Sequence, residues 1–339
     1  MYIETRGLER LEFELKTTNL TSFLKETLRQ ATPENCEIIE QLFRGGVGQL
    51  PINIITTDKT GSFGIQLNQN GRIGISIQTL VQIYISTEIF WDTFVNISSV
   101  VAFGYTGGII SLSDFTKNKL EAIREIASWT DPTKTINECL AHTNNKHIFT
   151  SFIRLGNDRN GDAFDNAVND IYWLSVAAFM LHEISHSRNM DISNCKNNQD
   201  VELCCDRFAF KILIDNIDKF ELTSEEKLKG YTKEDAKVKR LIALALMFFV
   251  IIKFFDTKHS SHPDGYSRIR QLIDCYEKQP DTDLSDLDGV FRLRNNFWNV
   301  LTAVIVLILH EKAVDLNSLQ HAPSAKDFCL ENLNKLRNI

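Results

Sequence analysis

Residues 171–190 read IYWLSVAAFMLHEISHSRNM, and this stretch decides the fold around it. Eleven nearly unbroken apolar residues precede His182, Glu183 and His186. The apolar run predicts a buried helix. Side chains four residues apart lie on one face of a helix, one turn above the other. The two imidazoles would therefore lie inside the protein and face a common point, at a spacing that suits a tetrahedral metal ion.

A HExxH pattern also arises by chance, and a core helix with two hydrogen-bonded histidines would carry the same letters. The segment VELCCDRFAF at residues 201–210 favours the metal. It predicts a largely buried helix with Glu202 and Asp206 on one face, where two carboxylates repel each other unless a cation is near. The alternative is an exposed helix face with ordinary acids.

In the metal interpretation, Glu202 is the third ligand and completes the two-His-one-Glu set of catalytic zinc sites. Asp206 would orient a ligand histidine through its second ring nitrogen, and His182 is the favoured partner. Glu183, next to the metal, would act as the catalytic base. Cys204 and Cys205 are predicted to be small core residues rather than thiolate ligands.

A third segment, HPDGYSRI at residues 262–269, predicts the start of another helix, with Pro263 and Asp264 in its first turn. His262 and Arg268 are candidate catalytic residues, because either could donate to the oxyanion formed when water attacks a carbonyl. A histidine that caps the helix and an arginine in a salt bridge explain the letters equally well.

HExxH, ExxxD sixteen residues after the second histidine, and HPxxxxRI together resemble the gluzincin peptidases, and in order and spacing the M48 group. In that group the HPxxxxRI segment contributes a His and an Arg to the active site. The ExxCD form of the second motif is more similar to the Lit-type phage-exclusion peptidases, family U49. The resemblance covers residues 181–269 and implies an intracellular zinc endopeptidase that cleaves a host translation factor during phage infection. A metzincin would need Gly at 189 and His at 192, where this chain has Asn189 and Ile192.

The whole chain predicts an α+β, zincin-like metallopeptidase with a mainly helical body and a small antiparallel sheet. Residues 8–45 predict helices that stop at Gly45-Gly46, and strands are expected at 52–56, 62–67 and 72–77. Asn70-Gly71 indicates a hairpin between the last two, and an edge of residues 62–77 could bind a substrate backbone. We expect an N-terminal helical segment at 1–50 and a catalytic domain at 51–339, in one continuous globular unit.

The chain has 339 residues and a net charge of −7, with no concentrated basic surface, so nucleic acid is not an expected partner. The expected partner is a protein or peptide substrate. No secretory signal pattern opens the sequence, and we expect a cytoplasmic protein. The apolar runs 241–252 and 300–309 fall short of the roughly 20 residues of a spanning helix. They predict buried core helices, with peripheral membrane contact as the alternative.

Two other classes of protein compete with the zinc peptidase. One is a non-catalytic zincin-like module that binds or regulates a partner, which would retain the metal without hydrolysing peptides. The other is an all-helical interaction protein in which the motifs are accidental, which would lack stoichiometric zinc. The sequence contains the complete catalytic set and therefore favours the enzyme.

Overall fold

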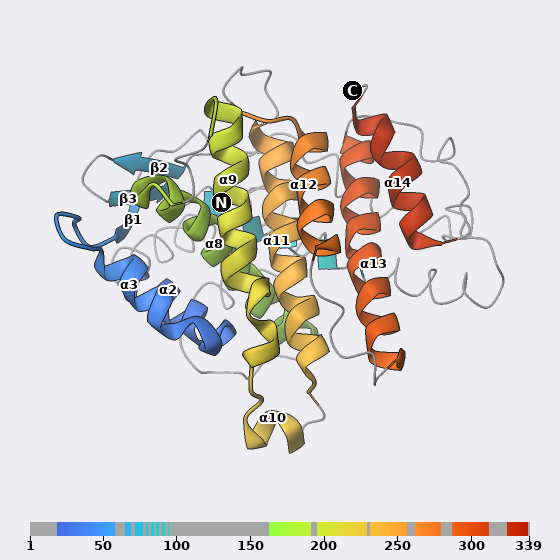
Figure 1. The fold of residues 1–339 in the computed structure, drawn as a ribbon, viewed down its shortest axis with the longest axis horizontal. Coiled ribbons are helices and arrows are strands. Elements are labelled where there is room, and N and C mark those ends of the chain that lie inside the picture. The colour runs from blue at the N-terminus through green and yellow to red at the C-terminus, as the bar shows by residue number, and fades with distance from the viewer. Residues whose placement is uncertain are drawn as a thin grey trace, which may run out of the picture.

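The computed structural model describes residues 19–57, 65–68, 72–76, 163–190, 195–228, 231–255, 262–278, 287–311 and 324–337, with single positions between 79 and 94. Helices predominate in these residues (Figure 1). They are α2 (Leu20–Ala31), η1 (Pro33–Asn35), α3 (Cys36–Arg44), α8 (Ala163–Arg188), α9 (Asn198–Phe210), η3 (Lys211–Asp215), η4 (Ile217–Lys219), α10 (Ser224–Leu228), α11 (Lys233–Phe255), α12 (Gly265–Glu277), α13 (Leu287–Glu311) and α14 (Ala325–Leu336). The strands are β1 (Asn53–Thr57), β2 (Ile65–Asn68) and β3 (Arg72–Ser76).

The sheet has the order β1-β3-β2 and is mixed. β2 and β3 pair antiparallel, from Ile65 opposite Ile75 onwards, but β1 and β3 pair parallel. The prediction of an antiparallel sheet is therefore wrong for the β1–β3 pair. β3 takes the centre because four of its five residues are buried, on both faces of the sheet. The predicted Asn70-Gly71 turn lies outside the described residues.

The outer edge of β1 is closed by helix α2. The Thr21 hydroxyl accepts a hydrogen bond from the Ile54 amide at 2.7 Å and lies 3.3 Å from the Ile54 carbonyl oxygen. Because a side chain occupies these groups, no further strand can pair with β1 at Ile54. α3 ends at Arg44, before Gly45 with a φ of 79°, which confirms the predicted glycine stop.

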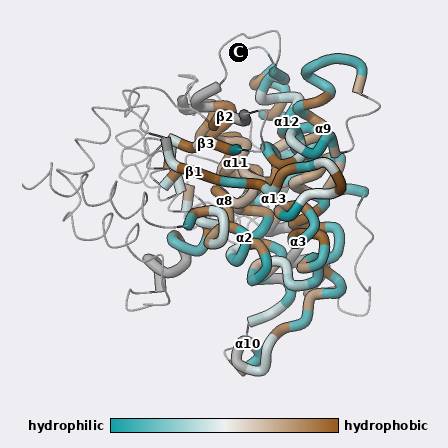
Figure 2. Tube along the Cα trace, turned by 90° about the vertical axis from the view of Figure 1, so that its left-hand side faces the viewer, coloured by the Kyte–Doolittle hydropathy of each residue, from teal (hydrophilic) through white to brown (hydrophobic). Residues whose placement is uncertain are grey.

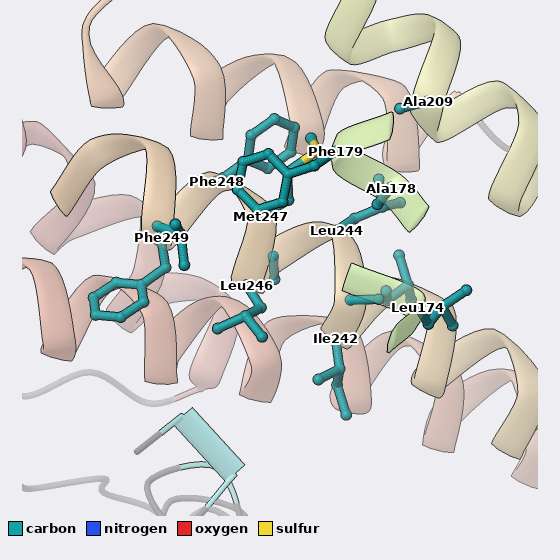
Figure 3. Packing of buried hydrophobic residues seen from close by; sticks show 14 of the residues in the cluster. Leu174, Ala178, Phe179, Ala209, Ile242, Leu244, Leu246, Met247, Phe248 and Phe249 are labelled. Carbon is teal, nitrogen blue, oxygen red and sulfur yellow. The ribbon is translucent and has the colours of Figure 1, made fainter. Parts of the chain in front are cut away.

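The core lies where three long helices meet. α8 packs against α2, α9 and α11, α11 also packs against α13, and α13 packs against α14. Apolar stretches gather at this centre (Figure 2). Figure 3 shows the α8–α11 contact, in which Ala178 and Phe179 lie beside Leu244 and Met247. α8 is buried almost all round from Val168 to Leu181, so its position is fixed before it reaches the HExxH residues.

The two apolar runs that raised the membrane question lie in this core. Residues 241–252 of α11 and 300–309 of α13 have at most 9 % of their surface exposed wherever they are apolar, which confirms the prediction of buried core helices. In the part of the chain that the structure describes, none of the helices combines the length and apolar composition that crossing a bilayer requires.

A π-helical turn, η3, continues α9 directly. Two of its carbonyl oxygens bind side chains from other elements. The Asn35 amide donates to Ile212 at 2.7 Å, and the Arg240 guanidinium donates to Leu213 at 2.9 Å. Arg240 is 1 % exposed and is paired with Glu34 of η1. These bonds explain how the wider turn is held, because carbonyls released from the α-helical pattern need other donors.

Candidate metal centre

The HExxH residues occupy the last turns of α8. The helix ends at Arg188, and Asn189 follows with a φ of 53°. Asparagine tolerates this left-handed conformation better than other side chains that carry a Cβ, so it can end the helix where a glycine usually would. The Met190 amide donates to the Ser185 carbonyl at 3.1 Å and closes the end of the helix. The chain thus turns away directly after the second histidine.

Helix α9 brings the acids to α8. It begins at Asn198, where the Asn197 side chain accepts a hydrogen bond from the Asp200 amide at 2.9 Å. α9 packs along α8, and its Glu202 and Asp206 both lie against His182. The predicted i and i+4 placement of the two carboxylates on one helix face is what allows both to reach the same histidine.

Three side chains converge on one point. Nε2 of His182 lies 3.2 Å from Nε2 of His186 and 3.3 Å from Oε2 of Glu202, and Nε2 of His186 lies 3.2 Å from Oε1 of Glu202. An ion that binds such ligands at about 2.1 Å in tetrahedral geometry places the ligand atoms about 3.4 Å apart. The two histidine nitrogens are therefore spaced like two ligands of one tetrahedral ion, and each lies beside one of the two oxygens of Glu202, so this group could hold a metal ion.

Asp206 holds His182 from behind. Its Oδ1 lies 2.8 Å from Nδ1 of His182, and the carboxylate is buried with 1 % of its residue surface exposed. This contact directs Nε2 of His182 toward the shared point. Burial alone would lower the pKa of His182, but the hydrogen bonds to Asp206 and Glu202 outweigh it and raise the pKa to about 10. Burial opposes ionisation of Glu202, yet its hydrogen bonds to the two histidines hold its pKa well below the usual range.

Arg268 joins the two acids from α12. One guanidinium nitrogen lies 3.0 Å from Oε2 of Glu202 and the other 2.5 Å from Oδ2 of Asp206. The residue is only 1 % exposed. Burial would lower the pKa of Arg268, but both carboxylates oppose this and raise it. Of the two interpretations that the sequence left open for Arg268, the geometry matches the salt bridge.

His262 lies at the rim of the centre. It precedes α12, its side chain is 42 % exposed, and its Nε2 lies 3.9 Å from Oε1 of Glu202. The helix cap is Asp264, whose side chain accepts a hydrogen bond from the Ser267 amide at 2.7 Å. Pro263 and Asp264 thus precede the helix rather than forming its first turn, and His262 is not the cap. The imidazole is placed where a molecule arriving from solvent could meet it.

Glu183 follows His182 on α8 and is partly buried. Burial raises the pKa of its carboxyl group, although the charges of His182 and His186 act in the opposite direction. A carboxylate with a raised pKa accepts a proton more readily than an exposed one, which is the property required of a general base.

Two features of the centre were not found in the sequence. Gly265 faces Ile252 of α11 so closely that an added Cβ would lie 2.8 Å from Cγ1, and Gln271 donates to the Leu203 carbonyl at 2.6 Å. The first contact holds α12 against α11 and the second holds it against α9. Neither could be predicted from the sequence, because both depend on how the helices pack. The expected core position is correct for Cys205, which is buried, and wrong for Cys204, which is half-buried beside Cys195.

The site thus contains a His-His-Glu group that could hold a metal ion, and the family of the chain follows from the sequence as a whole. The model of the family Peptidase U49 matches residues 111–287, more than half of the chain. The chain belongs to this peptidase family, as the resemblance predicted. Neither the curated proteins nor the solved structures contain a match.

Proposed function

We propose that this protein is a zinc-dependent endopeptidase of gluzincin type. The observation that carries the proposal is the group of His182, His186 and Glu202, in which the two imidazole nitrogens lie 3.2 Å apart and each lies 3.2–3.3 Å from one carboxylate oxygen of Glu202. Two imidazoles and one carboxylate are the protein ligands of catalytic zinc in known peptidases. Membership of a peptidase family supports hydrolysis as the reaction.

The side chains divide the work of peptide hydrolysis among them. A zinc ion held by the three ligands would supply Lewis acidity, which polarises a peptide carbonyl and acidifies water. Glu183 accepts the proton of the attacking water and passes it to the leaving amine. His262, exposed at the rim, donates to the oxyanion. Arg268 keeps Glu202 and Asp206 in place from the buried side, in contrast to the oxyanion role first considered for it.

The proposed substrate is an intracellular protein, cleaved in the cytoplasm. The resemblance to phage-exclusion peptidases supports a role in which infection triggers cleavage of a host protein. β2 is the outer strand of the described sheet on the side away from β1, and its main chain could pair with an extended substrate segment.

The test is to replace Glu183 with Gln, an isostere that removes the base and no ligand. Cells that produce wild type or Glu183→Gln are compared by proteomic mapping of new N-termini, with and without phage infection. Glu277→Gln, at an exposed acid on α12, is the control. We expect new N-termini with wild type and Glu277→Gln only, and equal zinc content in all three proteins.

Two other outcomes would contradict the proposal of a zinc peptidase. If Glu183→Gln retains zinc and excludes phage as well as wild type does, hydrolysis is not the function. The non-catalytic zincin-like module is then correct, because a neutral isostere beside the metal leaves a distant binding surface intact. If wild type carries no stoichiometric zinc, the metal proposal itself fails.

A further inference from the structure

Two neighbouring thiols lie at the beginning of α9, one before the helix and one within it. Cys195 lies three residues before the start of α9, and Cys204 lies in the second turn of that helix. Their sulfur atoms are 2.6 Å apart. Both cysteines are half-buried, so small reagents can reach them. The pair has no part in the proposed hydrolysis, because Cys204 is two residues beyond Glu202 and on another side of the helix.

The backbone already holds the two sulfurs at bonding range. A disulfide has an S–S bond of about 2.05 Å, so only a slight movement of either side chain separates the present arrangement from a covalent one. The loop is fixed by a further contact, because the Cys195 thiol also points to the Asp200 carbonyl oxygen, at 3.5 Å. Among the six cysteines that the structure describes, no other two have their sulfur atoms in contact.

We propose that Cys195 and Cys204 are a modification site at which a reversible disulfide forms and fastens the segment before α9 to that helix. Each thiol loses its proton, the two sulfurs bond, and two electrons pass to an oxidant. With hydrogen peroxide the products are the disulfide and two molecules of water. With a low-molecular-weight disulfide they are the protein disulfide and two small thiols. A dithiol reductant reverses the reaction. Intracellular disulfides of this reversible kind are usually transient or redox-sensing.

The bond would close a short loop around the beginning of α9, the helix that carries Glu202 and Asp206. Cross-linking lowers the conformational entropy of the unfolded chain, so the oxidised protein should be more stable than the reduced one. The restraint acts on the first two turns of α9, which include Glu202.

The disulfide can be detected directly in the full-length protein. Oxidised glutathione is added, free thiols are blocked by alkylation, and the protein is digested with trypsin. Cleavage after Arg188, Lys196 and Arg207 places Cys195 and Cys204 in different peptides. We expect one peptide pair, 189–196 joined to 197–207, that separates on reduction.

Variants identify the partners and test the effect. Cys195→Ser and Cys204→Ser should abolish the linked pair, whereas Cys205→Ser, in the same peptide as Cys204, should retain it. Oxidation should raise the Tm of wild type and Cys205→Ser by a few degrees and leave Cys195→Ser unchanged. Separate glutathione adducts on the two cysteines, without the linked pair, would overturn the proposal. A linked pair with an unchanged Tm would overturn its stabilising role. Both readouts are independent of zinc and of peptidase activity.

Discussion

The guanidinium of Arg268 lies 2.5 Å from Asp206, and the other carboxylate oxygen of Asp206 lies 2.8 Å from His182. A buried cation on α12 is thereby joined to a candidate ligand on α8 through one acid on α9. The arginine fixes one oxygen of the carboxylate, so the other is directed at the imidazole. The orientation of His182 therefore depends on a residue 86 positions further along the chain (268 − 182).

Replacing Arg268 should be far more costly than replacing its exposed neighbour. Arg268→Ala removes the buried guanidinium that pairs with Glu202 and Asp206, and loss of one partner of a buried pair costs about 3–5 kcal/mol. Arg270→Ala, on the same helix, removes a pair with Asp274 in which both side chains are 47 % exposed, and should cost about 0–1 kcal/mol. Urea denaturation of the metal-free proteins measures both. Equal costs would show that Arg268 is not a buried anchor.

Asp206→Asn should weaken zinc binding without abolishing it. The amide retains a hydrogen-bonding oxygen, but it loses the charge that holds the His182 ring and pairs with Arg268. Changes to such supporting residues typically cost about 10–100-fold in metal affinity or activity. Competition with a chromogenic chelator gives the affinity, with Asp274→Asn, whose side chain on α12 is 47 % exposed, as the control. An unchanged affinity would remove Asp206 from the metal centre.

The three histidines of the site should differ in their effect on bound zinc. His182→Ala and His186→Ala each remove one nitrogen donor of the His-His-Glu group and should lose most of the metal, because binding needs the complete ligand set. His262→Ala should keep about one zinc per chain, since its Nε2 lies 3.9 Å from Glu202 at the rim. Its peptidase rate should fall by about 10²–10³-fold if it binds the oxyanion. Zinc loss in His262→Ala would make it a ligand.

Gly265→Ala should destabilise the protein although alanine is the better helix former. The added methyl would lie 2.8–3.0 Å from three side-chain carbons of Ile252. Overpacking of this kind costs about 1–3 kcal/mol. Ile252→Ala removes all three carbons, so the double variant should be less destabilised than the sum of the two single variants. Thermal unfolding of the four proteins completes the cycle, and simple additivity would contradict the contact.

The sequence predicts the parts of the centre that obey helix periodicity. The histidine pair and the acid pair each lie four residues apart, so each pair could be placed on one helix face from its spacing alone. The salt bridges of Arg268 could not be predicted in this way, because they depend on how α12 packs against α9. Asp206, one partner of Arg268, is 62 residues away in the sequence.

The sheet illustrates the same limit. A hairpin is a local event, and the Asn-Gly pair predicted the neighbouring strands β2 and β3 correctly. The pairing of β1 with β3 instead places a strand with four buried residues at the centre of the sheet. This pairing joins strands that are not consecutive in the chain, so no turn residue in the sequence indicates it.

The contacts of the π-helical turn after α9 have a consequence for how the protein unfolds. Asn35 and Glu34 reach from the N-terminal helices to the η3 carbonyl of Ile212 and to the buried Arg240. A chain shortened to begin at residue 51 would leave Arg240 charged in the interior, without its acid. The first helices and the helices that carry the candidate ligands should therefore exchange their amide hydrogens as one cooperative unit, and a protease that removes the former should release the latter as an unstable fragment.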